Sequence, residues 1–132
     1  MRILIDTNIL FSALLFPRSK PAQALFHASA NHTPVLCDQN ISELRSILER
    51  KAPQLLPDAE LFLAEFSYEM IPAVRHADRL IRDATDLPIL NAAIVYDVDI
   101  ILTGDKDFLS LRLEHPRCLT AAEYLKEQSG GI

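Results

Sequence analysis

The sequence contains few of the residues that mark several classes of protein. Its 132 residues include no tryptophan, three glycines and two cysteines. So little glycine excludes a flexible linker or a collagen-like chain. Cys37 and Cys118 lie far apart and form neither a disulfide framework nor a CxxC metal pair, so we expect two buried thiols in a reducing compartment. The four histidines have no ligand-like spacing, which argues against a zinc site.

Long hydrophobic runs and an excess of basic charge are also absent. The most apolar run, residues 9–16, is far shorter than the roughly 20 residues that span a bilayer. Asp6 interrupts the first apolar residues before a signal sequence can form, so we expect a cytoplasmic protein with no membrane segment. Thirteen Lys and Arg residues against 18 Asp and Glu residues give a formal net charge of −5. This balance argues against nucleic-acid binding by charge alone, although a bound divalent cation would invert the local field.

Short apolar runs alternate with longer helical patterns along the chain. The apolar runs predict strands at residues 3–5, 34–37, 70–72, 99–103 and 117–119. The helical patterns predict helices at residues 22–30, from 38 to before 53, and at residues 58–68, 88–96 and 121–128. This alternation favours an α/β fold with a central parallel sheet covered by helices. We expect one domain over residues 1–128, followed by a disordered tail at residues 129–132.

Capping signals mark the starts of two of these helices. Asp38 precedes an apolar stripe and is a candidate N-cap. Thr120 and Glu123 have the spacing of a capping box, in which each side chain binds the backbone of the other.

Two acidic residues lie just after predicted strands. Asp6 follows the strand at residues 3–5, and Asp105 follows the strand at residues 99–103. Ligands of parallel sheets bind beyond the carboxyl ends of the strands, where the strand order reverses, and both residues fall at such a position. Taken alone, Asp6 suits a helix cap better than a functional site, and Asp105 suits either role.

Two further acids occupy helices. Glu43 has no opposite charge four residues on, and Asp86 precedes a proline at a helix start; taken alone, they suit a solvated surface and a cap. Four carboxylates in one pocket would raise each other's pKa unless a cation were present. A hard divalent cation such as Mg²⁺ or Mn²⁺ is the natural counter-charge, and such sites hydrolyse phosphodiesters.

Three segments of the sequence resemble the acid-bearing segments of PIN domains. They are residues 3–10 (ILIDTNIL), 86–93 (DLPILNAA) and 102–109 (LTGDKDFL), and Glu43 matches the second acid by its intermediate spacing. The resemblance runs from residue 3 to about residue 125. The Asp-x-Pro-Ile form of the middle segment is similar to the VapC-like toxins of type II toxin–antitoxin pairs.

The resemblance implies a three-layer α/β/α sandwich around a parallel sheet of four or five strands. It also implies an Mg²⁺- or Mn²⁺-dependent endoribonuclease, a hydrolase of RNA phosphodiesters that forms a homodimer and binds an antitoxin protein. The implied catalytic and metal-binding acids are Asp6, Glu43, Asp86 and Asp105. The implied supporting residues are Thr7, Asn8, Thr103 and Asp107. Asp83 is the alternative to Asp86, which we prefer for its register to the following proline.

Basic residues near these segments are candidates for holding flanking RNA phosphates. We expect this role for Arg18, Lys20 and Lys106, each of which is equally compatible with an ordinary surface cation. Arg45, Arg50 and Lys51 lie on the Glu43 helix and are not assigned to the site.

Two other functions are compatible with the same alternation of predicted strands and helices. A receiver-like phosphoacceptor domain needs an acceptor aspartate after a middle strand and a lysine after a late strand, and neither stands out. A PIN-fold interaction module without catalysis would bind a protein partner. The RNA target, the number of metal ions and the existence of an antitoxin stay open.

Overall fold

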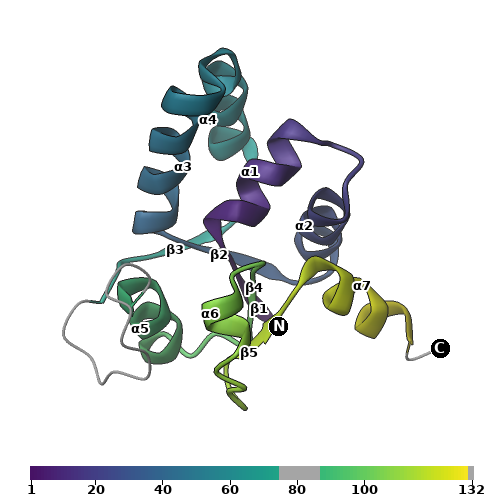
Figure 1. The fold of residues 1–132 in the computed structure, drawn as a ribbon. Helices are drawn as coiled ribbons and strands as arrows, with labels where there is room; N and C mark the ends of the chain where they lie inside the picture. The colour runs from purple at the N-terminus through teal and green to yellow at the C-terminus, as the bar shows by residue number, and fades with distance from the viewer. Residues whose placement is uncertain (75–86, 131–132) are drawn as a thin grey trace.

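A five-stranded parallel sheet forms the centre of the protein (Figure 1). The computed structural model describes residues 1–74 and 87–130. The strands are β1 (Arg2–Ile5), β2 (Thr33–Cys37), β3 (Glu69–Ile71), β4 (Ile100–Leu102) and β5 (Arg117–Leu119). They lie in the order β3-β2-β1-β4-β5, and every neighbouring pair is parallel. The predicted α/β class with a parallel sheet is confirmed.

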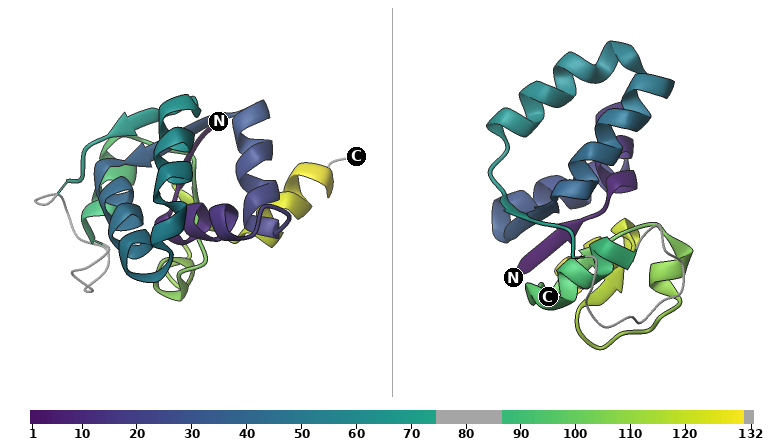
Figure 2. Two further views of the ribbon diagram at one scale, coloured as in Figure 1. Left: turned by 90° about the horizontal axis from the view of Figure 1, so that it is seen from above. Right: turned by 90° about the vertical axis from the view of Figure 1, so that its left-hand side faces the viewer.

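Helices cover both faces of the sheet. They are α1 (Thr7–Leu15), α2 (Lys20–Asn31), α3 (Asp38–Lys51), α4 (Leu56–Glu65), α5 (Leu87–Val95), α6 (Lys106–Leu109) and α7 (Ala121–Gly130), with a 3₁₀ turn at Pro53–Leu55. Side chains alternate along β1, so Ile3 and Ile5 enter the core beneath α1–α4 and α7, whereas Leu4 enters the core beneath α5 and α6. The result is the predicted three-layer sandwich (Figure 2).

Hydrogen bonds at the helix starts follow the capping signals in most places. The carboxylate of Asp6 accepts the backbone N–H of Thr7 and begins α1. The capping box of α7 is confirmed, because the N–H of Thr120 donates to Glu123 Oε1 at 2.9 Å and the N–H of Glu123 donates to Thr120 Oγ1 at 3.0 Å. The prediction for Asp38 is wrong: Cys37 is the N-cap of α3, and Asp38 Oδ1 instead accepts the N–H of Ala73 at 2.9 Å.

Four helices differ from the predicted boundaries by one to three residues: α2, α4, α5 and α7. α4 begins at Leu56 because Pro57 occupies its first turn, where a missing N–H costs nothing, and it ends at Glu65, three residues before the predicted end at Tyr68. α7 extends to Gly130, beyond the predicted end at Gln128. Residues 131 and 132 lie outside the described part of the chain.

The strand order reverses between β1 and β4. β2 and β3 lie on one side of β1, and β4 and β5 lie on the other. Ile5 pairs with Leu102 at the carboxyl ends of the two central strands, and the N–H of Asp6 donates to the Leu102 carbonyl at 3.0 Å. The residues that follow β1 and β4 are therefore held side by side, as the sequence predicts.

Two further expectations concern thiols and membranes. Cys37 and Cys118 are free thiols; Cys37 is buried and Cys118 is partly buried. None of the helices in the described ranges is both long enough and apolar enough to cross a membrane.

Candidate active site

Three of the four predicted acids line one cavity at the carboxyl edge of the sheet. Asp6 follows β1, Glu43 lies on α3, and Asp105 precedes α6. The cavity has a volume of about 280 Å³. Its lining residues are Asp6, Thr7, Asn8, Glu43, Ser46, Ile47, Arg50 and Asp105. The fold therefore gathers acids that are up to about a hundred residues apart in the sequence.

Asp6 is the most buried of these acids, with 6% of its surface exposed. Its Oδ2 accepts the hydroxyl of Thr103 at 2.7 Å, and its Oδ1 accepts the N–H of Thr7 at 2.8 Å. Burial raises the pKa of Asp6, the two hydrogen bonds oppose that shift, and the negative charges of Asp105 and Glu43 add to it. A cation in the cavity would oppose this shift by attracting the ionised carboxylate and by offsetting the repulsion between the acids.

A hydrogen-bond relay positions Glu43. The N–H of Cys37 donates to Asn40 Oδ1 at 3.2 Å, which turns Asn40 Nδ2 toward Thr7 Oγ1 at 3.0 Å. The Thr7 hydroxyl then donates to Glu43 Oε1 at 2.9 Å. Gln39 Nε2 donates to the other carboxylate oxygen of Glu43 at 3.4 Å. The relay orients Glu43 from the buried side of the helix.

Thr103 connects the acids of the two central strands. Its hydroxyl donates to Asp6 and accepts the N–H of Asp105 at 3.0 Å. Asp105 is the N-cap of α6, and its Oδ1 accepts the N–H of Asp107 at 2.8 Å. Asp107 thus contacts Asp105 through its backbone; its side chain is exposed and does not line the cavity.

Several predicted site residues lie elsewhere. Asp86 and Asp83 lie outside the described residues. Arg18 lines a different hollow, between α1 and α2. Lys20 and Lys106 are exposed and do not line the acidic cavity.

Among the residues of the site that the sequence analysis did not assign are Asn40 and Arg50. Asn40 is fully buried and contacts Thr7, with a longer contact of 3.4 Å from Nδ2 to Asp6. Asn40 lies four residues before Leu44 and therefore on the buried face of α3. A polar residue at such a position indicates a buried hydrogen-bonding role. Arg50 lies seven residues after Glu43, two helical turns along the same face, and that spacing could have indicated it.

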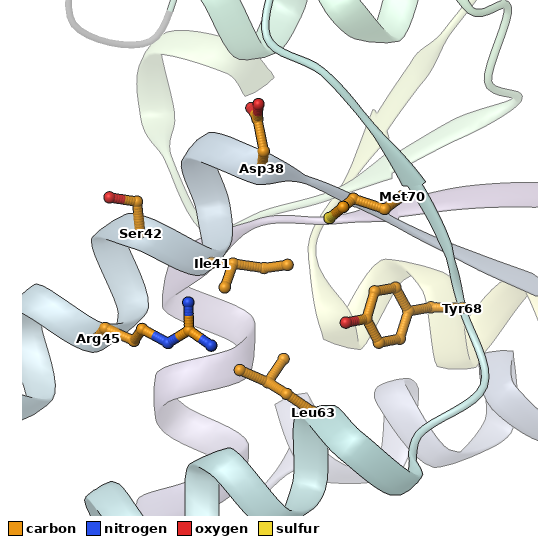
Figure 3. Close-up of a pocket in the computed structure, with 7 residues that line it drawn as sticks. All are labelled: Asp38, Ile41, Ser42, Arg45, Leu63, Tyr68 and Met70. Atoms are coloured by element: carbon orange, nitrogen blue, oxygen red, sulfur yellow. The ribbon is translucent and has the colours of Figure 1, made fainter.

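A second hollow lies on another side of α3 (Figure 3). It has a volume of about 410 Å³ and is lined by Asp38, Ile41, Ser42, Arg45, Leu63, Tyr68 and Met70. Both guanidinium contacts of Arg45 go to Glu60, at 2.8 Å each. α3 thus separates an acidic cavity from a mixed polar and apolar one.

The donors of the acidic cavity fit a hard divalent cation by their chemistry. Three carboxylates, with hydroxyl and amide oxygens beside them, are the ligands that Mg²⁺ and Mn²⁺ prefer. Within residues 1–74 and 87–130, no three His, Cys, Asp or Glu side chains already converge as a ready-made metal cluster. Burial and the neighbouring carboxylates both raise the pKa of Asp6, and positive charge in the cavity would oppose that shift.

The fold and the cavity define a class: an α/β/α protein with a carboxylate site at the switch point of a parallel sheet. The family model for the PIN domain matches residues 2–107. The chain therefore belongs to the PIN domain family, which is a family of nucleases.

One solved structure shares the fold across nearly its whole length. It is the crystal structure of VapBC2 from Rickettsia felis bound to a DNA fragment from their promoter. The match has a TM-score of 0.71 at 18% sequence identity, and it covers 91% of this chain and 98% of that chain. Among curated proteins, no match to the sequence was found.

Proposed function

We propose that this PIN domain is a divalent-metal-dependent endoribonuclease that hydrolyses RNA phosphodiester bonds. The observation that carries the proposal is the cavity at the switch point of the sheet, which Asp6, Glu43 and Asp105 line. Asp86 is the fourth acid of the proposed set and lies outside the described residues. Mg²⁺ or Mn²⁺ is the proposed cofactor, because both prefer oxygen ligands.

A bound divalent cation would supply an activated water and offset the negative charge that develops on the phosphate. The protein's own contribution is to hold the carboxylates in place. The hydroxyl of Thr103 and the N–H of Thr7 donate to Asp6, and the hydroxyl of Thr7 donates to Glu43. Without a cation, the same carboxylates repel an RNA phosphate, so we expect cleavage to depend strictly on added metal.

We further propose that the nuclease is the toxin of a toxin–antitoxin pair, acts in the cytoplasm and forms a homodimer. The fold shared with a VapBC2 structure supports the toxin assignment, and an antitoxin protein is the partner it suggests. A receiver-like role is less favoured, because β5 in the described chain ends at Leu119 and is followed by Thr120 rather than by lysine.

Cleavage of a mixed RNA pool tests the nuclease proposal. The wild-type protein is incubated with Mg²⁺ or Mn²⁺, with and without EDTA, alongside Asp105→Asn. Asp58→Asn is the matched control, because Asp58 is exposed in the first turn of α4 and outside the cavity. We expect cleavage by the wild type and the control, and loss of cleavage in Asp105→Asn and in EDTA.

Two results would redirect the proposal. A folded protein that binds metal but cuts no RNA in the pool contradicts a broad nuclease and favours a narrow substrate or a bound inhibitor. A folded protein that neither binds metal nor cuts RNA favours the catalytically idle PIN-fold module.

A further inference from the structure

One face of α3 carries both an acid and a base into the same cavity. Glu43, Ser46, Ile47 and Arg50 follow one another at intervals of three, one and three residues, and all four line the acidic cavity. Such spacing places side chains on one face of a helix. The cavity therefore continues from the carboxylates along α3 to its last turn.

Arg50 is the one basic residue among the described residues that line this cavity. Its side chain is exposed, and it takes part in none of the ion pairs found in residues 1–74 and 87–130. Arg45, on the same helix, has both guanidinium contacts occupied by Glu60. The structure thus leaves the guanidinium of Arg50 available for an anion from outside the protein.

The position of Arg50 separates it from the carboxylates. Seven residues of α-helix rise about 10 Å along the axis, and Arg50 forms no ion pair with a carboxylate within the described ranges. Arg50 thus enters the cavity about two helical turns from Glu43 without being neutralised by the acids. It suits a second anionic group further along an extended ligand.

We propose that Arg50 binds a phosphate of the RNA strand that flanks the bond to be cut. The planar guanidinium donates two parallel hydrogen bonds to phosphate oxygens, which a lysine cannot do. This inference rests on the proposed ribonuclease function and assigns the flanking contact to Arg50. Lys20 and Lys106 do not line the cavity, and Arg18 lines another hollow.

Steady-state kinetics on a short, fluorescein-labelled single-stranded RNA with Mn²⁺ test this role. The variants are Arg50→Ala and Arg50→Lys, with Lys51→Ala as the control, because Lys51 is the next residue of α3, is exposed and does not line the cavity. A contact that holds substrate and transition state equally raises KM and leaves kcat unchanged. We expect KM to rise about tenfold or more in Arg50→Ala, while kcat stays within about twofold of the wild-type value. In Arg50→Lys we expect a smaller rise in KM.

A binding measurement separates this inference from the nuclease proposal. Fluorescence anisotropy of the same RNA is followed against salt concentration in an Asp105→Asn background, in which we expect no cleavage. Loss of one phosphate contact to a single strand makes the slope of log K against log salt shallower by about 0.7. We expect this change with Arg50→Ala; a comparable change with Lys51→Ala would show that charge alone matters and would overturn the assignment.

The combined outcomes distinguish the two failures. Wild-type cleavage with equal KM and salt slope in Arg50→Ala and Lys51→Ala overturns the role of Arg50 and leaves the nuclease standing. A fall in kcat with unchanged KM also overturns it, because Arg50 would then act on the reacting phosphate. RNA binding that depends on Arg50 without any cleavage supports the contact and contradicts the nuclease. Absence of RNA binding together with absence of wild-type cleavage overturns both.

Discussion

Replacing Thr103 by valine removes one hydroxyl from the centre of the acidic cavity and preserves the shape of the side chain. The residue is fully buried, so water cannot replace the lost partner. The hydroxyl donates to the Asp6 carboxylate at 2.7 Å and accepts the N–H of Asp105 at 3.0 Å. The substitution therefore removes the hydroxyl donor from one oxygen of the Asp6 carboxylate and the hydroxyl acceptor from the N–H of Asp105.

The size of the effect follows from these two contacts. A hydrogen bond to an ionised carboxylate contributes about 1.5–3 kcal/mol, and the neutral one contributes about 0.5–1.5 kcal/mol. We expect Thr103→Val to lower the free energy of unfolding by about 2–4 kcal/mol near pH 8. Because the Thr103 hydrogen bond lowers the pKa of Asp6, it stabilises the ionised form. The loss is therefore larger at pH 8 than at pH 4, where Asp6 is more protonated.

Urea denaturation in EDTA at the two pH values measures this prediction. Thr33→Val is the control, because it makes the same change of side chain at a residue that is exposed at the start of β2. We expect the control to change the free energy of unfolding by less than about 0.5 kcal/mol. A loss in Thr103→Val that equals the control, or that does not depend on pH, would refute the assigned role of the hydroxyl.

Three further predictions follow from other contacts. Burial and negative neighbours raise the pKa of Asp6 in the folded protein, so the stability from its protonation is present at acid pH and is lost as the pH rises through that pKa. The free energy of unfolding of Asp6→Asn, relative to that of the wild type, should therefore increase from pH 4 to pH 8 in urea titrations. A decrease of this difference over the same pH range would contradict the prediction. Thr120→Ala removes the capping box of α7 and should cost about 1 kcal/mol by the same titration without changing RNA cleavage, and altered cleavage would contradict this. Burial raises the pKa values of Cys37 and Cys118 each to about 11, so mass spectrometry should find both unmodified by iodoacetamide at pH 8 until urea is added.

The positions of Asp6 and Asp105 were predictable from simple rules. Short apolar runs before each acid predict strands, and parallel strands place their carboxyl ends at one edge of the sheet. The two acids lie at the edge formed by neighbouring β1 and β4. Glu43 was assigned by resemblance and spacing, and the structure adds the hydroxyl of Thr7 that holds it.

The local contacts of the site were less accessible to sequence reasoning. Asp38 has the composition of an N-cap, but its carboxylate binds the N–H of Ala73, which is distant in sequence and reaches it only through the pairing of β2 with β3. Asn40 gains its role from the way α3 packs against α1, which turns one side of Asn40 toward Thr7. Arg50 lines the acidic cavity further along the same helix. Helical periodicity shows that residues share a face, but not which neighbouring element that face meets.

The account depends most on the claim that carboxylates from β1, α3 and the turn after β4 form one divalent-cation site. Isothermal titration of Mn²⁺ into the metal-free protein tests it directly, with Glu43→Gln as the variant and Glu49→Gln as the control on the exposed part of the same helix. The account predicts binding by the wild type and the control, and affinity at least about tenfold weaker in Glu43→Gln. Equal binding by all three proteins, or no binding by the wild type, would contradict it.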